Sequence, residues 1–280
     1  MTRLTLRYLT AADIPFADSL RANAGWNQTP ADWQRFIELS PRGCLLAECE
    51  GRPVATATTI TYGHDLGWIG MMLVHPDFRR RGIARVLMQH SIEILQSAGV
   101  KSIKLDATPA GREVYLRIGF KDEYSLTRYQ ADNANASPQS TKDIRAFKKD
   151  DLPKVLELDR AATGVCRENL LARLISDSLK TLVHESTDKI AGFGILRPGS
   201  LASYLGPIVA TDPTHAQQIA TSLLDGKLFC DLPDKNQSVA AWTKSEKLSP
   251  QRTLTRMYLG ENISAPAAGT YFAIAAPELG

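Results

Sequence analysis

The sequence contains little cysteine and no long apolar run. Its 280 residues include only Cys44, Cys49, Cys166 and Cys230, with no C-x-x-C pair and no metal-like spacing to histidine. We therefore expect free thiols in a reducing compartment, and no metal site. No apolar run is long enough to cross a membrane, and the first residues lack the hydrophobic core of a signal peptide. The sequence predicts a cytoplasmic protein with no membrane partner.

The chain also lacks an excess of charge of either sign. It has 33 Lys and Arg against 30 Asp and Glu, a formal net charge of +3, and its basic residues form no long block. We therefore expect no nucleic-acid partner. The hydrophobic content of 44% is ordinary for a globular protein with a real core. The length suits one large domain or two of ordinary size.

The most informative stretch is VHPDFRRRGIA, residues 74–84. An apolar run ends at Val74 and an amphipathic segment begins inside the stretch, a pattern typical of strand, short loop and helix. Three arginines precede Gly82, and glycine permits a close backbone approach to a ligand. The first amides of the helix have no intrahelical partner, and the helix dipole there favours an anion. The stretch predicts a pyrophosphate site, with a solvated helix start as the alternative.

A second motif follows one helix and one strand later. Alternating Ile103, Leu105 and Ala107 predict a strand, Thr108-Pro109 begins a helix, and Tyr115-x-x-x-Gly119-Phe120 closes it. The two motifs in this order resemble those of the GNAT superfamily of N-acetyltransferases. The resemblance implies that acetyl-CoA binds with its pantetheine arm along the strand that ends at Val74, in a gap between this strand and the strand at 103–107.

The resemblance assigns roles to particular residues. It implies that the acyl-CoA is held by Met72, Leu73, Val74, Arg79, Arg80, Arg81, Gly82, Ile83 and Ala84. It makes Tyr115 the candidate acid that protonates the leaving thiolate, with a core tyrosine that closes the short helix as the alternative. It places the acceptor beside the first two helices, so the loop residues Trp26 and Asn27 are candidate substrate contacts. The base stays open among Glu48, His64, Asp65, Asp106, water and solvent.

The second half of the chain repeats the first. Arg7, Asp13 and Pro15 recur as Arg145, Asp151 and Pro153, each shifted by 138 positions. Residues 131–141 have no apolar periodicity and are predicted to be a linker between domains at 1–130 and 142–280. We expect an α/β (α+β layered) protein in which each GNAT-like domain has a mixed, mostly antiparallel central sheet flanked by helices.

The second copy departs from the motif at the predicted site. The residues after Pro213 contain neither the arginines nor the glycine, and no Tyr-x-x-x-Gly-Phe motif follows. The chain therefore resembles tandem members of the superfamily with one degenerate domain. The predicted function is transfer of an acetyl group from acetyl-CoA to a primary amine of a small molecule or a protein. A non-catalytic acyl-CoA-binding or protein-interaction module stays open, as does a homodimer.

Overall fold

The computed structural model describes residues 3–135, 142–186, 189–263 and 271–280. In the first half the strands and α-helices are β1 (Leu4–Tyr8), α1 (Ile14–Asn23), α2 (Pro30–Leu39), β2 (Cys44–Cys49), β3 (Arg52–Tyr62), β4 (Leu66–Val74), α3 (Ile83–Ser97), β5 (Ser102–Ala107), α4 (Pro109–Leu116) and β6 (Lys121–Asn135). In the second half they are β7 (Ile144–Ala146), α5 (Leu152–Thr163), α6 (Glu168–Ser176), β8 (Lys180–Ser186), β9 (Lys189–Arg197), β10 (Ser203–Ala210), α7 (Pro213–Ser222), β11 (Asp225–Pro233), α8 (Gln237–Ser245), β12 (Ser249–Gly260) and β13 (Tyr271–Ala273).

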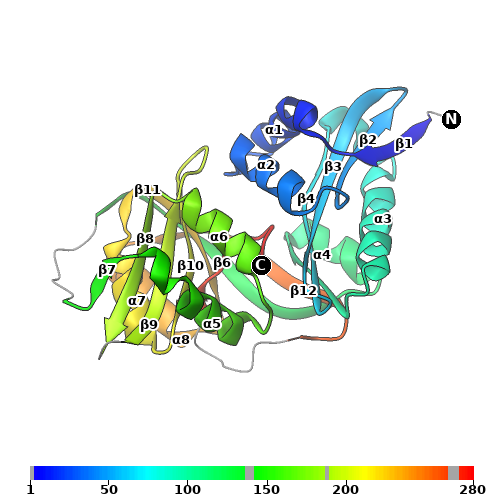
Figure 1. The fold of residues 1–280 in the computed structure, drawn as a ribbon. Coiled ribbons are helices and arrows are strands. Elements are labelled where there is room, and N and C mark those ends of the chain that lie inside the picture. The colour runs from blue at the N-terminus through cyan, green and yellow to red at the C-terminus, as the bar shows by residue number, and fades with distance from the viewer. Residues whose placement is uncertain (1–2, 136–141, 187–188, 264–270) are drawn as a thin grey trace.

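The described strands form one continuous sheet through both halves. Its order is β1-β2-β3-β4-β5-β12-β6-β11-β10-β9-β8-β7, and β13 pairs with β10. All pairs are antiparallel except β4–β5 and β10–β11. The two halves exchange one strand each: β12 of the second half pairs with β5 of the first, and β6 of the first half pairs with β11 of the second. The strand order is therefore the same when it is followed from either end of the sheet. This mixed, mostly antiparallel sheet flanked by helices confirms the predicted fold class (Figure 1).

The strand exchange corrects part of the predicted linker. Residues 131–135 continue β6, and Ala131 and Asn135 lie opposite Leu228 and Asp225 of β11. The pairing partner is a strand some ninety residues away, which local apolar periodicity does not report. Residues 136–141 lie outside the described residues. The domain boundaries themselves stay a prediction.

An ion-pair network recurs with the internal repeat. Arg7 binds Asp13 at 2.7 Å and Glu48 at 2.8 Å, which ties β1 to the first helical turn and to β2. Arg145 makes the same two contacts, to Asp151 and Glu185. The same side chains therefore fix the same start of the fold in both halves.

Alternate residues of the strands pack against helices on opposite faces of the sheet. Leu45 and Ala47 of β2 share a core cluster with Leu87 of α3, whereas Cys44 and Leu46 pack with the residues of α1 and α2. This second cluster continues into α5 and α6, so α1, α2, α5 and α6 form one core between the halves. In Figure 1 the end of the described chain also lies between the two halves.

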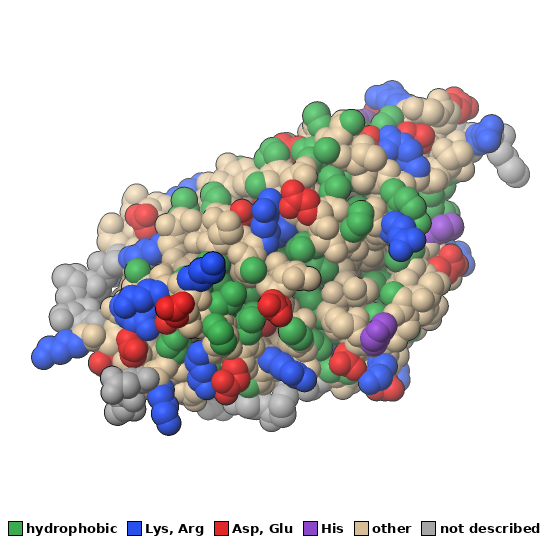
Figure 2. Space-filling model, viewed as in Figure 1, with side chains coloured by type: hydrophobic (Ala, Val, Ile, Leu, Met, Phe, Trp, Pro, Cys, Tyr) green, Lys and Arg blue, Asp and Glu red, His purple; other side chains and the backbone are tan. Residues whose placement is uncertain are grey.

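Neither the surface charge nor the cysteines indicate a special site. Figure 2 shows basic and acidic side chains interspersed over the visible face. The four cysteines are free thiols, and Cys166 is exposed while the other three are buried. Within the described ranges, no helix combines the length and the apolar character that a membrane crossing requires.

Candidate active site

The two parallel strands at the centre of the first half separate partway along their length. The β4–β5 pairing runs from Leu66↔Ser102 to Trp68↔Lys104, although β4 continues to Val74 and β5 to Ala107. β4 turns away at a bulge, where the register against β3 shifts and Met71 takes a left-handed φ of 46°. The hydroxyl of Thr56 donates to the Met71 carbonyl at 3.0 Å and holds the bulge. The gap that the resemblance implied is therefore present.

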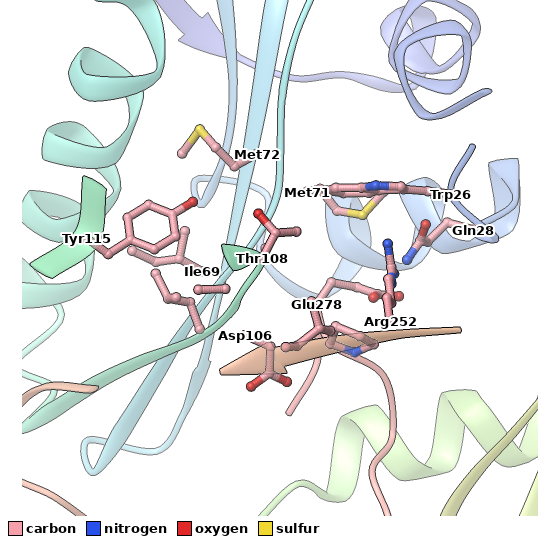
Figure 3. A pocket seen from close by; sticks show the side chains of 15 residues that line it. Trp26, Gln28, Ile69, Met71, Met72, Asp106, Thr108, Tyr115, Arg252 and Glu278 are labelled. Atoms are coloured by element: carbon pink, nitrogen blue, oxygen red, sulfur yellow. The ribbon is translucent and has the colours of Figure 1, made fainter. Parts of the chain in front are cut away.

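A pocket of about 670 Å³, including its open mouth, lies at this gap. The first half supplies to its lining Trp26, Gln28, Met71, Met72, Asp106 and Tyr115, among others. The second half supplies Arg252 and Leu254 from β12, and Pro277 and Glu278 from the segment after β13. Figure 3 shows Tyr115 and Met72 at one end, and Trp26, Gln28, Arg252 and Glu278 at the other.

The arginine-rich loop connects β4 to α3. Gly82 is the N-cap of α3 with φ 81°, and a Cβ added there would meet no atom within 4 Å. The glycine is therefore needed for its left-handed backbone rather than for lack of space. Arg79 and Arg81 donate to the carbonyls of Val74 at 3.2 Å and Asp77 at 2.9 Å, which ties the loop to the strand end.

The loop residues differ in burial. Arg79, Arg80, Arg81, Gly82 and Ala84 are exposed. Ile83 is buried against the sheet and fixes the start of α3. The first amides of a helix lack intrahelical partners, so this exposed helix start can hold an anion. Of the other predicted CoA contacts, Met72 lines the pocket, whereas Leu73 is buried in the core and Val74 is partly buried against α3.

Tyr115 lies on α4, which begins at the edge of the gap. The hydroxyl of Thr108 caps α4 by accepting from the Gly111 amide at 3.2 Å. The Tyr115 ring packs 6.0 Å from the ring of Phe120, and its hydroxyl is turned toward the middle of the pocket (Figure 3). Burial raises the pKa of Tyr115, which keeps the phenol protonated.

The two predicted acceptor contacts lie in different surroundings. Trp26 lines the pocket, and its neighbour Gln28 does so as well. Asn27 instead binds the second half: its amide oxygen accepts from the backbone amides of Leu201 at 2.9 Å and Ala202 at 3.0 Å, and its amide nitrogen donates to Ala202. This geometry gives Asn27 a structural contact between the halves. A direct role in acceptor binding stays a prediction.

The four side chains considered as bases are mostly paired or remote. Glu48 binds Arg7, and Asp65 binds Lys101 at 2.8 Å on the surface. His64 is exposed and its ring nitrogen contacts the Ala98 carbonyl at 3.2 Å. Asp106 alone among them lines the pocket.

The carboxylate charge of Asp106 is neutralised by Arg256 of the second half. Both of its carboxylate oxygens accept from Arg256 at 2.8 Å. Burial nevertheless raises the pKa of Asp106. A carboxylate held in this way has little capacity left to bind a substrate amine.

Two charged pocket residues were not predicted from the sequence. Glu278 follows β13 and Arg252 lies on β12, both far along the chain from the motifs of the first half. No local pattern around either residue signals a site, because each reaches the pocket only through the strand exchange and the path of the last segment.

The corresponding groove of the second half is filled by the chain itself. The parallel β10–β11 pairing ends at Tyr204↔Phe229, and beyond it β13 pairs with β10 through Ile208↔Ala273. The Ile274 amide donates to the Asp231 carbonyl of β11 at 3.1 Å. β13 thus joins the second half and lies in its gap.

The helix start beside that groove carries a carboxylate. Asp212 is the N-cap of α7, and its side chain accepts from the Thr214 amide at 2.7 Å. These hydrogen bonds lower the pKa of Asp212, so it is ionised. A negative charge already occupies the position where an anion would bind.

Comparisons with known proteins assign the family. A model described as Acetyltransferase (GNAT) family matches residues 14–120, and one described as Acetyltransferase (GNAT) domain matches residues 155–273. Holothin acyltransferase from Pseudoalteromonas sp. (strain SANK 73390) is 24% identical over 184 residues, which are 65% of this chain and 61% of that protein. The chain spans about three fifths of the length of the curated relatives it matches.

Solved structures resemble the whole chain. A provisionally assigned acetyltransferase from Pyrococcus horikoshii has a TM-score of 0.86 at 26% identity, over 99% of this chain and 96% of that one. A tandem GNAT protein from the clavulanic acid biosynthesis pathway has a TM-score of 0.64 at 17% identity, over 94% and 100%, which shows a shared fold. The chain belongs to the GNAT acetyltransferase superfamily and carries two GNAT domains in tandem.

Proposed function

We propose that the chain is an N-acetyltransferase that moves an acetyl group directly from acetyl-CoA to a primary amine, with one working site in the first half. The observation that carries the proposal is a pocket lined by both the bulged edge of β4 and Tyr115, with the exposed start of α3 following β4 in the chain. Family membership and the similarity to holothin acyltransferase support acyl transfer as the reaction.

The proposed site divides the binding of CoA between two elements. The pyrophosphate would lie at the first amides of α3 and beside the exposed guanidinium groups of Arg79, Arg80 and Arg81, since charge-assisted hydrogen bonds to phosphate are strong. The pantetheine arm would lie along β4 past Met72, where the pairing with β5 has ended. The thioester then reaches the pocket beside Tyr115.

The chemistry transfers one acyl group and two protons. The amine nitrogen attacks the thioester carbonyl carbon, the carbon–sulfur bond breaks, and an amide and the CoA thiol are formed. A backbone N–H at the bulge near Met71 is the candidate donor to the developing oxyanion. Tyr115 gives its proton to the leaving thiolate, and burial raises the pKa of the phenol, which keeps this proton on Tyr115 until the thiolate forms.

Glu278 is the proposed acceptor of the amine proton. Its side chain lines the pocket and its Oε2 has no hydrogen-bond partner within the described part of the chain. Burial raises the pKa of Glu278, with the nearby Asp32 adding to the effect. A carboxylate with a raised pKa is a better base than an ordinary one, and it can act directly or through a water molecule.

A single CoA site per chain is the corollary. β13 fills the groove of the second half, and Asp212 repels an anion from the start of α7. The second domain therefore serves the first by supplying Arg252, Leu254, Pro277 and Glu278 to its pocket. A homodimer and the cytoplasmic location stay predictions.

A calorimetric titration with acetyl-CoA tests the site. We expect one site per chain, abolished in Gly82→Glu because charge and bulk enter the phosphate position. Gly63→Glu is the matched control, since Gly63 also has positive φ and open space around it but lies in the turn before β4. Loss of binding in both variants would point to general damage, and two sites per chain would contradict the single-site proposal.

Catalysis is tested by thiol release. We expect release of CoA thiol that depends on an added amine and is lost in Tyr115→Phe. Normal acetyl-CoA binding without amine-dependent release, across primary amines with and without a second charged group, would favour the non-catalytic acyl-CoA-binding module.

A further inference from the structure

The acceptor end of the pocket combines three unpartnered polar atoms. They are Oε1 of Gln28, Oε2 of Glu278 and Nε of Arg252, each buried and without a hydrogen-bond partner within the described residues. Figure 3 shows the three side chains next to one another below Trp26. Buried polar groups are normally paired, so three orphans in one pocket indicate a polar ligand with both donors and acceptors.

Glu278 is held rigidly in this pocket. Only 6% of its surface is exposed, and its Cβ lies 2.7 Å from where a Cβ on Gly70 would be. The backbone on either side is anchored: the Trp68 indole donates to the Pro277 carbonyl at 2.9 Å, and the Tyr62 hydroxyl donates to the Leu279 carbonyl at 2.6 Å. The carboxylate is therefore presented to the pocket in a fixed position.

Arg252 differs from the other interior arginines. Each of the buried ones among the described residues is within 4 Å of a carboxylate: the pairs are Arg21–Asp18, Arg35–Asp32, Arg128–Asp231, Arg167–Asp159, Arg197–Asp32 and Arg256–Asp106. The largely buried Arg252 makes no such ion pair within the described ranges. It also lies opposite Arg128 in the β12–β6 register, a like-charge pair that is unfavourable.

The fixed charges around this group leave Arg252 electrostatically unsatisfied. Asp231 is already bound by Arg128, and Asp32 by Arg35. Burial lowers the pKa of Arg252, and Arg128 lowers it further, while Asp231 and Glu278 oppose the shift. A buried cation without a bound carboxylate is costly unless a ligand brings the missing anion.

We propose that the acceptor is an amine that also carries a carboxylate, an amino acid or an ω-amino acid, with its amine at Glu278 and its carboxylate at Arg252. This inference rests on the proposed acetyltransferase function and names its substrate class. A planar guanidinium matches a carboxylate with two parallel hydrogen bonds, and the Gln28 amide oxygen is placed to accept from the amine. A lysine side chain within a protein lacks the carboxylate and leaves Arg252 unpaired.

The test compares each acid with its carboxamide. The rate of CoA thiol release is measured for the α-amino acids, β-alanine and γ-aminobutyrate, and for the corresponding carboxamides, which have the same size and no negative charge. We expect kcat/KM for at least one acid to exceed that of its amide by on the order of 10²-fold, as for the loss of one partner of a buried charge pair.

Variants assign the preference to Arg252. Arg252→Gln is expected to reduce the acid-to-amide ratio to a few-fold while the acetyl-CoA Kd is unchanged, and Arg252→Lys is expected to retain part of the ratio. Arg42→Gln removes the same charge from an exposed position outside the pocket and should leave the ratio intact.

The outcomes separate this inference from the proposed function. Equal use of acids and amides by the unchanged protein, or a preference that survives in Arg252→Gln, would overturn the acceptor class and leave acetyl transfer standing. A preference for aminoalkylphosphonates over amino acids would overturn the carboxylate assignment. If the protein binds acetyl-CoA but acetylates only amines without a carboxylate, the carboxylate assignment is also overturned. If it does not bind acetyl-CoA, both proposals are overturned.

Discussion

Two arginines that lie opposite each other in neighbouring strands allow a direct test of whether a buried cation stabilises the fold. Arg128 of β6 and Arg252 of β12 lie opposite in the register. Arg128 is 3% exposed and donates to both oxygens of Asp231, at 3.0 Å from Nε and 2.6 Å from Nη2. Arg252 has no equivalent carboxylate among the described side chains. We predict opposite results when each is replaced by methionine, which keeps much of the side-chain length.

The expected magnitudes follow from what each variant leaves behind. Arg128→Met leaves the fully buried Asp231 with the Tyr204 hydroxyl at 3.0 Å as its remaining side-chain donor. Removing one partner of a buried ion pair costs about 3–5 kcal/mol. Arg252→Met removes a cation that repels Arg128 and strands no carboxylate. Its cost should stay within about 1 kcal/mol, because the like-charge contact that it relieves offsets the lost packing.

Thermal and urea unfolding of the two variants, without ligand and at neutral pH, measure the difference. A loss of about 3 kcal/mol lowers the melting temperature of a chain that unfolds as one unit of this size by about 6 °C or more. We expect that shift in Arg128→Met and a shift of at most about 2 °C in Arg252→Met. If Arg252→Met is as damaging as Arg128→Met, then Arg252 is a structural cation, and the argument that it waits for the carboxylate of an acceptor is wrong.

Three further predictions concern the site and its support. Tyr115→Phe should lower kcat by about 10²–10⁴-fold with little change in the acetyl-CoA Kd, because the phenol is needed only as the thiolate leaves. An unchanged kcat in a thiol-release assay would rule out Tyr115 as the acid. In the unchanged protein kcat/KM should rise with pH as Glu278 deprotonates, and this rise should occur at a higher pH than for an ordinary glutamate because the pKa of Glu278 is raised. Glu278→Gln should lose this rise, and a variant that keeps it would assign the base elsewhere. Asn27→Ala should lower the unfolding free energy by about 1–3 kcal/mol, because the backbone groups of Leu201 and Ala202 lose their hydrogen-bond partners. Calorimetry should show an unchanged acetyl-CoA affinity, and a lost affinity would give Asn27 a direct role in binding.

The parts of the site that could be predicted are those written in short, contiguous segments. The stretch at 74–84 and the segment at 103–120 each combine a strand end, a helix start and a few side chains in one short run of sequence. Local rules suffice there: a capping threonine, a glycine with positive φ, and alternating or helical apolar periods. The repeat was visible because Arg7 and Asp13 recur as Arg145 and Asp151 with the same spacing, and the structure shows that both are ion pairs.

The parts that could not be predicted depend on long-range pairing. β12 enters the first half between β5 and β6, and β6 extends into the expected linker as far as Asn135 and pairs with β11. Hydrophobic periodicity indicates a strand but not its neighbour, so the exchange has no signature in one sequence. Arg252 and Glu278 were missed for this reason. The resemblance made Asn27 a candidate acceptor contact, and its hydrogen bonds to residues 201–202 could not be predicted because they are equally remote in sequence.

The degeneracy of the second copy and the completeness of the first pocket have the same structural cause. β13 occupies the gap between β10 and β11, where its Ala273 pairs with Ile208. The chain leaves that gap at Ile274 and, within four residues, places Glu278 against Gly70 in the first pocket. A CoA molecule in the second groove would need the space that β13 fills, and displacing β13 would withdraw Glu278. The proposal of one site per chain rests on this link, since CoA bound in the second groove would displace β13 and withdraw Glu278 from the first pocket.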